Sequence, residues 1–326
     1  MSAYSDASDA VFEVFGDTTP LVEPVSVDEA FLDVAELRRV RGEPVTIAAR
    51  LRAEVRARVG LPIAVGIART KFLAKVASQH AKPDGLLLVP PGRELEFLHP
   101  LPVRRLWGVG AKTEERLRSH GIATVAEVAD LGESMLAGLV GPSMGRRLYA
   151  LSRNIDRRKV QTGVRRRSVG AQRALGRAGN TMSPIEVDVV VVTLIDRITG
   201  RMRNAHYTGR TVMLRLRFGD FGRATWSRTL PRATASTAPI LAAARNLVAA
   251  ATPLIAERGL TLVGFAVSNI DHTGAQQMEL PFDAPADLLA VDAAVDRVRS
   301  RYGNSALTRG VQLGLDPQPD IARTAD

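Results

Sequence analysis

Apolar and polar residues along the first ninety positions follow the spacing of helices and short strands. The pattern predicts helices over 5–16, 45–59 and 70–80 and strands over 61–67 and 85–89. Gly60 stands where the second of these helices should end, as a helix C-cap does. Alternating strands and helices of this kind predict an α+β layer, with helices packed on one face of a sheet.

One apolar stretch, residues 21–34, carries two adjacent carboxylates, Asp28 and Glu29, in its middle. Successive side chains on a straight strand point to opposite faces, so a shared task for this pair requires a bend such as a tight hairpin turn. Aligned carboxylates are hard oxygen ligands for Mg²⁺, the ion of two-metal phosphoryl transfer. The other interpretation is a solvated acidic pair at a strand end, because charged side chains are mostly exposed.

The character of the chain changes at Pro90-Pro91-Gly92, after which 91–152 predicts short helices without a clear strand. Within it, Gly108-Val109-Gly110-Ala111-Lys112 predicts a helix-hairpin-helix, whose glycines permit a tight turn and expose backbone N–H groups to a phosphate. A nucleotide-binding P-loop is excluded because Ala111 stands where that motif needs a glycine. A simple packing turn between two helices is the alternative.

A basic linker follows over 153–167. It contains Arg153, Arg157, Arg158, Lys159, Arg165, Arg166 and Arg167 against a single acid, Asp156. A charge run between two domains of a basic protein is typical of a segment that follows a sugar-phosphate backbone, although many such runs are simply solvated.

The third region, 168–275, predicts a small α+β domain. Ser183-Pro184-Ile185-Glu186 is a capping box that starts a helix, and alternation over 211–218 places Arg215 and Arg217 on the face opposite the apolar residues. A helix over 238–251 and a strand over 262–270 complete the sheet. Arginines on an open sheet face suit phosphate contacts that do not depend on base sequence, and an ordinary solvated face is the alternative.

The last region, 276–326, begins with a candidate docking peptide. Gln277, Leu280 and Phe282 have the spacing of a short linear motif that inserts apolar anchors into a partner's pocket. The pattern predicts a further amphipathic helix over 286–302, and the end from residue 317 has the composition of a disordered terminus.

Composition narrows the function classes. The chain has 326 residues, 45% of them hydrophobic, and a formal net charge of +10, which favours a polyanionic partner. It has no cysteine and five scattered histidines, so disulfides, thiolate zinc sites and cysteine nucleophiles are excluded. The beginning lacks the basic and apolar parts of a signal peptide, and the apolar run over 189–195 is too short to span a bilayer. We therefore expect a cytoplasmic protein without a membrane segment.

Taken together, the motifs resemble those of one family. Ser26-Val27-Asp28-Glu29-Ala30-Phe31-Leu32-Asp33 resembles the acidic palm motif of the Y-family DNA polymerases, the translesion class. The matching stretches that follow in the same order are Ala64-Val65-Gly66-Ile67-Ala68, Lys71-Phe72-Leu73-Ala74-Lys75-Val76-Ala77-Ser78, Lys82-Pro83-Asp84-Gly85, Trp107-Gly108-Val109-Gly110 and Arg167-Ser168-Val169-Gly170. The resemblance covers residues 4–315, almost the whole chain.

The resemblance implies a partial palm over 1–90, a thumb with the helix-hairpin-helix over 91–152, the basic linker over 153–167 and a little finger over 168–275. It implies that Asp28 and Glu29 bind catalytic Mg²⁺ and that Lys82 holds the triphosphate of the incoming dNTP. The residues that it implies for contact with primer-template DNA are Gly108, Gly110, Lys112, Arg165, Arg166, Arg167 and Ser168. Residues 277–282 would bind a sliding clamp, and the chain would act as a monomer.

One departure bears on activity. The family opens with a strand that carries a further Asp ligand, followed by a fingers domain, and this chain enters at the helix before the acidic strand. Phosphoryl transfer depends on positioning and charge neutralisation, so we expect this chain to be weakly active or inactive, as a truncated polymerase.

Two rival functions remain at this stage. A helix-hairpin-helix DNA glycosylase would use Lys112 with Asp130, but it leaves the acidic pair and the second half of the chain unexplained. A non-catalytic, clamp-tethered DNA-binding remnant shares the thumb, little finger and docking peptide with the polymerase interpretation and differs only in chemistry.

Overall fold

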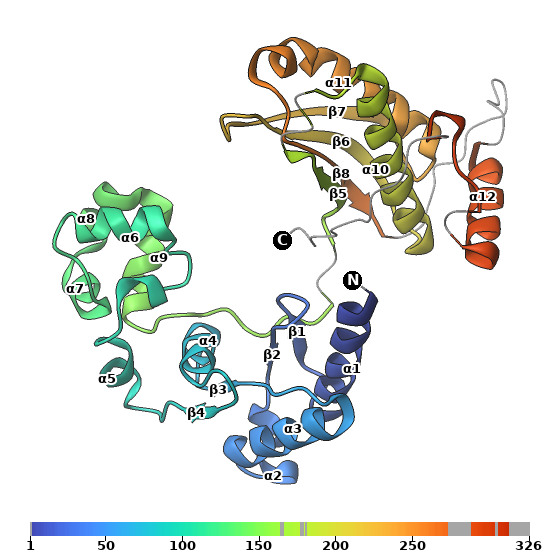
Figure 1. Ribbon diagram of the computed structural model, residues 1–326. Coiled ribbons are helices and arrows are strands. Elements are labelled where there is room, and N and C mark those ends of the chain that lie inside the picture. Colours follow the sequence, from blue (N-terminus) through green and yellow to red (C-terminus); the bar gives the residue numbers. More distant parts are fainter. Residues whose placement is uncertain are drawn as a thin grey trace. The chain divides into compact units, whose positions relative to one another are not determined.

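The computed structural model describes residues 2–163, 166–176, 179, 181–272, 288–303 and 306–312. The chain divides into two compact units, Met1–Val164 and Arg165–Asp326, which are described separately (Figure 1). The predicted α+β character is confirmed in both units, since each combines helices with short or long strands.

The first half of the first unit alternates helices with very short strands. Its elements are α1 (Ser2–Thr18), β1 (Val22–Pro24), β2 (Ala30–Leu32), α2 (Arg38–Arg41), α3 (Pro44–Val59), β3 (Val65–Ile67), α4 (Lys71–His80) and β4 (Leu86–Leu88), with a 3₁₀ turn at Ala35–Leu37. Helix α3 ends at Gly60, which adopts a φ of +76° and donates its N–H to the carbonyl of Arg56, as the sequence predicted.

The strands of this half form two separate pairs. β1 and β2 are antiparallel, and β3 and β4 are parallel, so the described residues do not form the single sheet that the sequence predicted. The strand predicted over 61–67 is also too long: β4 offers partners only to Val65–Ile67. Gly66 lets β3 approach α4 closely, because a Cβ there would lie 2.2 Å from the carbonyl oxygen of Ala74.

The second half of the first unit is helical, as predicted. It contains α5 (Glu94–Leu98), a 3₁₀ turn at Val103–Arg105, α6 (Ala111–Arg118), α7 (Val125–Asp130), α8 (Glu133–Val140) and α9 (Pro142–Ser152). Leu106, Leu117 and Leu148 from this half belong to the same buried cluster as Phe72 and Leu73 of α4. The helical half and α4 therefore share one core, which fixes the loop that carries Trp107 against the face of α4.

The second unit is a four-stranded antiparallel sheet with helices on one face. Its elements are β5 (Ser168–Ala174), α10 (Pro184–Asn204), β6 (Thr208–Arg217), β7 (Arg223–Thr234), α11 (Thr237–Arg258), β8 (Leu262–Asp271), α12 (Leu288–Tyr302) and a 3₁₀ turn at Gly310–Gln312. The strand order is β5-β8-β6-β7. The capping box predicted at Ser183 and Glu186 is present at the start of α10.

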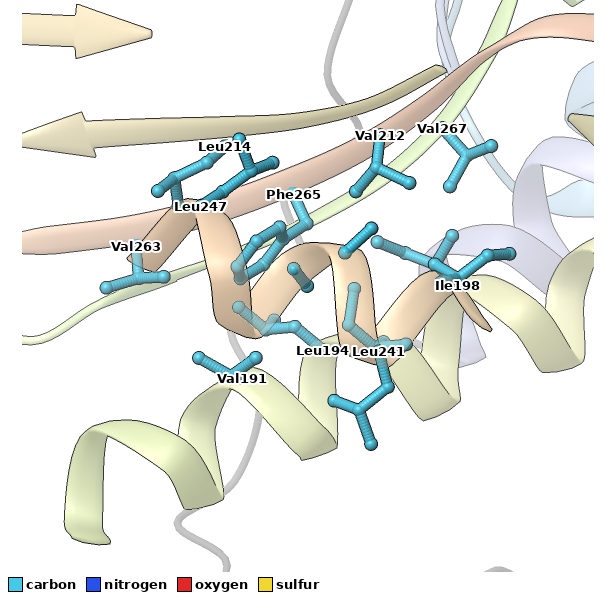
Figure 2. Close-up of a cluster of buried hydrophobic side chains, with 14 of the residues drawn as sticks. Val191, Leu194, Ile198, Val212, Leu214, Leu241, Leu247, Val263, Phe265 and Val267 are labelled. Atoms are coloured by element: carbon cyan, nitrogen blue, oxygen red, sulfur yellow. The ribbon is translucent and has the colours of Figure 1, made fainter. Parts of the chain in front are cut away.

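The core of this unit lies between the sheet and two helices. Figure 2 shows Val191, Leu194 and Ile198 of α10 and Leu241 and Leu247 of α11 beneath side chains of β6 and β8. Within the described part of the chain, α11 has the length and hydropathy of a membrane span. Its buried residues belong to this core, however, so we assign it as a core helix of the domain.

Candidate active site

The acidic pair lies at a hairpin turn. Residues 25–29 connect the antiparallel strands β1 and β2, in which Pro24 is paired with Ala30. The turn is closed by the N–H of Val25, which donates to the carbonyl of Glu29 at 2.8 Å. Inside it, the hydroxyl of Ser26 donates to Asp28 Oδ1 at 2.5 Å. The bend that the sequence required for a shared task of the two acids is therefore present.

The two carboxylates have different surroundings. Asp28 is exposed, whereas Glu29 is half-buried and its Oε2 accepts a hydrogen bond from Lys75 Nζ of α4 at 2.5 Å. One helical turn earlier, Lys71 makes the corresponding ion pair with Glu23 of β1. The hairpin is thus fastened to α4 by two lysines, of which Lys75 reaches one of the predicted metal ligands.

A cavity of about 1090 Å³ brings the acidic turn together with basic side chains. Asp28 and Glu29 line it, and so does Lys82, which is exposed in the turn before β4. The other cationic residues that line it are Arg69, Lys71, Lys75, Arg157, Arg158 and Lys159. Carboxylates beside a concentration of positive charge form a site suited to a polyanion that carries a metal ion.

The donor set of this site fits Mg²⁺ only in part. Two carboxylates on one turn supply hard oxygen ligands, and Mg²⁺ commonly completes its shell with waters and substrate phosphates. Within the described ranges, no group of three or more His, Asp or Glu residues is placed to hold a metal ion. Waters or oxygens from a phosphate substrate would therefore have to complete the coordination shell.

The predicted helix-hairpin-helix turn is present before α6. Gly108 has a φ of +103°, a conformation that favours glycine, and Gly110 is the N-cap of α6 without a side-chain cap. Both glycines and Lys112 are exposed. The first N–H groups of the helix have no partner within the helix, so the turn presents donors of the kind that bind phosphate.

Trp107, directly before this turn, is surrounded by cations. The ring centroid lies 4.4 Å from Arg158 Cζ, 5.6 Å from Lys75 Nζ and 5.8 Å from Arg147 Cζ. Phe31 of β2 contacts the same ring, with 5.9 Å between the two centroids. Sequence reasoning missed this cluster because its members are far apart along the chain; the only local signal was the position of Trp107 beside the glycine turn.

The beginning of the basic linker is fixed to the first unit. Asp156, whose side chain is 3% exposed, accepts hydrogen bonds from the backbone N–H of Phe72 at the start of α4 and from the guanidinium of Arg158. Burial acts to raise the pKa of Asp156, but the hydrogen bonds from Arg158 and Phe72 outweigh it and leave this pKa below its usual range. Arg153 donates to the carbonyl oxygens of Tyr149 and Ala129.

These partners show that two of the linker's arginines also serve the fold, while contact of the linker with a sugar-phosphate backbone stays a prediction. Arg153 and Arg158 are held by groups of the protein itself, so their charge is partly used in the fold. Arg166 and Arg167 are exposed, and Ser168 is the exposed first residue of β5. Arg165 lies outside the described residues, as do Gln277, Leu280 and Phe282 of the candidate docking peptide.

The second unit places the two predicted arginines as expected. Arg215 and Arg217 of β6 lie on the face opposite the buried Leu214 and Leu216. Arg215 is exposed and stands across from Thr225 of β7 in the ladder. This face is therefore an open, polar sheet surface with positive charge, which suits contact with phosphates.

Comparison with known proteins agrees with this architecture. The chain matches the impB/mucB/samB family over residues 1–79, the helix-hairpin-helix motif of the same family over 91–122 and its C-terminal domain over 166–280. It is 40% identical to DNA polymerase IV 2 of Mesorhizobium japonicum over 324 residues, an alignment that covers 95% of this chain and 77% of that protein. DNA polymerase IV of Desulfatibacillum aliphaticivorans is 34% identical over 307 residues and is covered to 76%, with 93% of this chain aligned.

Solved structures share the fold. A Y-family polymerase chimera, Dbh-Dpo4(243-245)-Dbh, aligns with a TM-score of 0.68 at 20% identity, covering 82% of this chain and 76% of that one. The insertion ternary complex of Dbh DNA polymerase aligns with a TM-score of 0.57 at 20% identity and the same coverage.

A hairpin that carries two acids, a helix-hairpin-helix and a small antiparallel sheet occur here within the fold that the solved Y-family polymerases share. The chain belongs to the impB/mucB/samB family, that of the Y-family DNA polymerases. It is accordingly a DNA-directed DNA polymerase by class, and the activity of the class is translesion synthesis.

Proposed function

We propose that this chain adds nucleotides to a primer on damaged template DNA, with the reaction centred on the cavity beside the β1–β2 hairpin. The observation that carries the proposal is the shared cavity, because it joins Asp28 and Glu29 to Lys82 and further cations. Asp28 and Glu29 would hold Mg²⁺, which when bound aligns the attacking and leaving oxygens and neutralises the charge that develops between them.

The lysines of the cavity would bind the phosphates of the incoming dNTP. Lys82 is exposed, so its ammonium is available to a phosphate as a point charge. Lys82→Ala is expected to raise the apparent KM for dNTP about tenfold or more. This is the loss of affinity that usually follows removal of one charge-assisted hydrogen bond to a phosphate.

Primer-template DNA would be held by two kinds of surface. In the first unit, Gly108, Gly110 and Lys112 offer backbone N–H groups and one ammonium to a phosphate. In the second unit, Arg215 and Arg217 on the open sheet face, with Arg166, Arg167 and Ser168 at its start, would contact the sugar-phosphate backbone. These contacts are independent of base sequence, as a polymerase requires. Binding should weaken steeply with salt, because phosphate contacts release counterions.

The rate of nucleotide addition by this chain should be low. Within the described residues, the acidic pair is joined by no third carboxylate, and phosphoryl transfer depends on complete charge neutralisation. A slow polymerase and a DNA-binding remnant without activity therefore remain the two functions to separate. Attachment to a sliding clamp through 277–282, action as a monomer and a cytoplasmic location stay predictions from the sequence.

Primer extension with Mg²⁺ tests the proposal. Wild-type protein should extend a primer, and Asp28→Ala should abolish extension while leaving DNA affinity unchanged. Glu36→Ala, a change in an acidic residue of the same region that does not line the cavity, is the control and should extend as the wild type does. No extension by the wild type would favour the remnant, and extension that survives Asp28→Ala would show that Asp28 does not carry the reaction.

A further inference from the structure

Helix α4 presents two lysines to the β1–β2 hairpin, and each pairs with a different acid. Lys71 contacts Glu23 and the carbonyl oxygen of Lys159, and its side chain is only 9% exposed. Lys75 contacts Glu29, with side chains 24% and 34% exposed. The first pair joins three segments of the fold. The second pair includes Glu29, a carboxylate of the proposed site. The first pair therefore stabilises the fold, whereas the second also acts on the site.

Lys75 also contacts the loop before α6, through Trp107. Its Nζ lies 5.6 Å from the ring centroid of Trp107, a distance at which an ammonium is attracted to an indole face. The same ring also attracts Arg158 and Arg147, which keeps it in place among positive charges. Glu29 and Trp107 together therefore define where the ammonium of Lys75 rests.

We propose that Lys75 is a positioning residue that fixes the carboxylate of Glu29 and competes with a divalent cation for it. The inference rests on the proposed role of Glu29 as a metal ligand. Lys75 donates to Oε2 of Glu29, so a divalent ion on this carboxylate would be a second cation beside its ammonium, and the two would repel each other. A divalent ion on Glu29 therefore favours withdrawal of the Lys75 ammonium from this carboxylate, and the phosphates of a nucleotide in the same cavity offer it a new partner.

Titration of the full-length chain with Mn²⁺, followed by the electron paramagnetic resonance signal of the free ion and without DNA or nucleotide, tests this role. Lys75→Met should bind Mn²⁺ about threefold or more tightly than the wild type, a factor in keeping with the loss of one partly exposed ion pair and of a like-charge neighbour. Lys75→Arg keeps the charge and should retain an affinity close to that of the wild type.

Lys71→Met is the matched control on the same helix. It should lower the urea midpoint of the first unit, because it leaves the half-buried Glu23 without its cation, and it should raise Mn²⁺ affinity less than Lys75→Met does, because Lys71 is paired with Glu23 and not with Glu29. Lys75→Met with unchanged or weaker Mn²⁺ affinity would overturn the inference about Lys75 alone. Identical binding by the wild type and Glu29→Gln would instead show that Glu29 is not a ligand, and both the metal site and the inference would fall.

Discussion

Asp156 is the residue whose loss should most clearly damage the first unit. Its buried carboxylate accepts hydrogen bonds from the N–H of Phe72 at 3.1 Å and from Arg158 through the backbone N–H, Nε and Nη2 at 3.2, 2.7 and 2.8 Å. Asp156→Ala removes the carboxylate at the start of α4 and leaves Arg158 without its anion. We expect a loss of about 2–4 kcal/mol in the free energy of unfolding, the range for breaking a buried charged pair together with a helix cap.

Urea unfolding followed by tryptophan fluorescence measures this loss in the right part of the molecule. The chain has two tryptophans, Trp107 in the first unit and Trp226 in the second, so a Trp226→Phe background reports the first unit alone. With a urea m-value of about 2 kcal/mol/M, the midpoint should fall by about 1–2 M. Arg158, which lies 4.4 Å from the ring centroid of Trp107, should also lose its fixed position, so the native emission should change.

The matched control is Asp130→Ala, which removes an exposed aspartate at the end of α7 in the same unit. It should change the free energy of unfolding by less than about 0.5 kcal/mol, as surface substitutions usually do. A loss below that value for Asp156→Ala would refute the reasoning, because it would show that the linker does not depend on this carboxylate for its attachment to α4.

The remaining predictions concern pH, packing and DNA affinity. The pKa of Asp156 is below its ordinary 3.8, so the stabilisation by its carboxylate is complete above about pH 4 and is lost as the pH falls through the folded-state pKa. The urea midpoints of the wild type and Asp156→Ala should therefore converge as the pH falls below about 4. A difference between the two midpoints that stays constant over this pH range would contradict the prediction. Gly145→Ala should lower the free energy of unfolding by about 2–3 kcal/mol, since its Cβ would lie 2.4 Å from a backbone nitrogen of α8. Gly138→Ala, whose Cβ would enter open space, should be neutral or slightly stabilising in the same urea unfolding experiment. Arg215→Ser with Arg217→Ser should lower the slope of log affinity against log salt by about two, measured by fluorescence anisotropy on primer-template DNA, and an unchanged slope would exclude this face.

Local signals in the sequence were sufficient to predict the structure where a residue's conformation or contacts depend on its neighbours along the chain. The capping box at Ser183 and Glu186 predicted the start of α10, because the hydrogen bonds of a cap involve residues three apart. Alternation predicted that Arg215 and Arg217 share the open face of the sheet, because side chains alternate along a strand. The hairpin at Asp28 was predicted from chemistry, since two adjacent acids act together only at a bend.

The sequence was insufficient to predict contacts between residues that lie far apart along the chain. Phe72 and Asp156 are 84 residues apart, and nothing near either one predicts that a linker carboxylate lies at the start of α4. The cations around Trp107 come from α4, α9 and the linker, and are assembled only by the tertiary fold. Helix α11 was predicted to end at 251, but it continues through Pro253 to Arg258; that proline is exposed, so the hydrogen bond it cannot make falls on the solvent side.

The charges of the cavity suggest an order of events at the proposed site. Of the acids that line it, Glu29 is paired with Lys75 and Asp156 with Arg158, and among the described residues no lysine or arginine forms an ion pair with Asp28 or Asp33. The exposed cations Lys82, Arg157 and Lys159 line the same cavity and add to its positive potential. Such a field attracts a polyphosphate more strongly than a free divalent ion, so a nucleotide that carries its own metal is the species that this cavity should admit first.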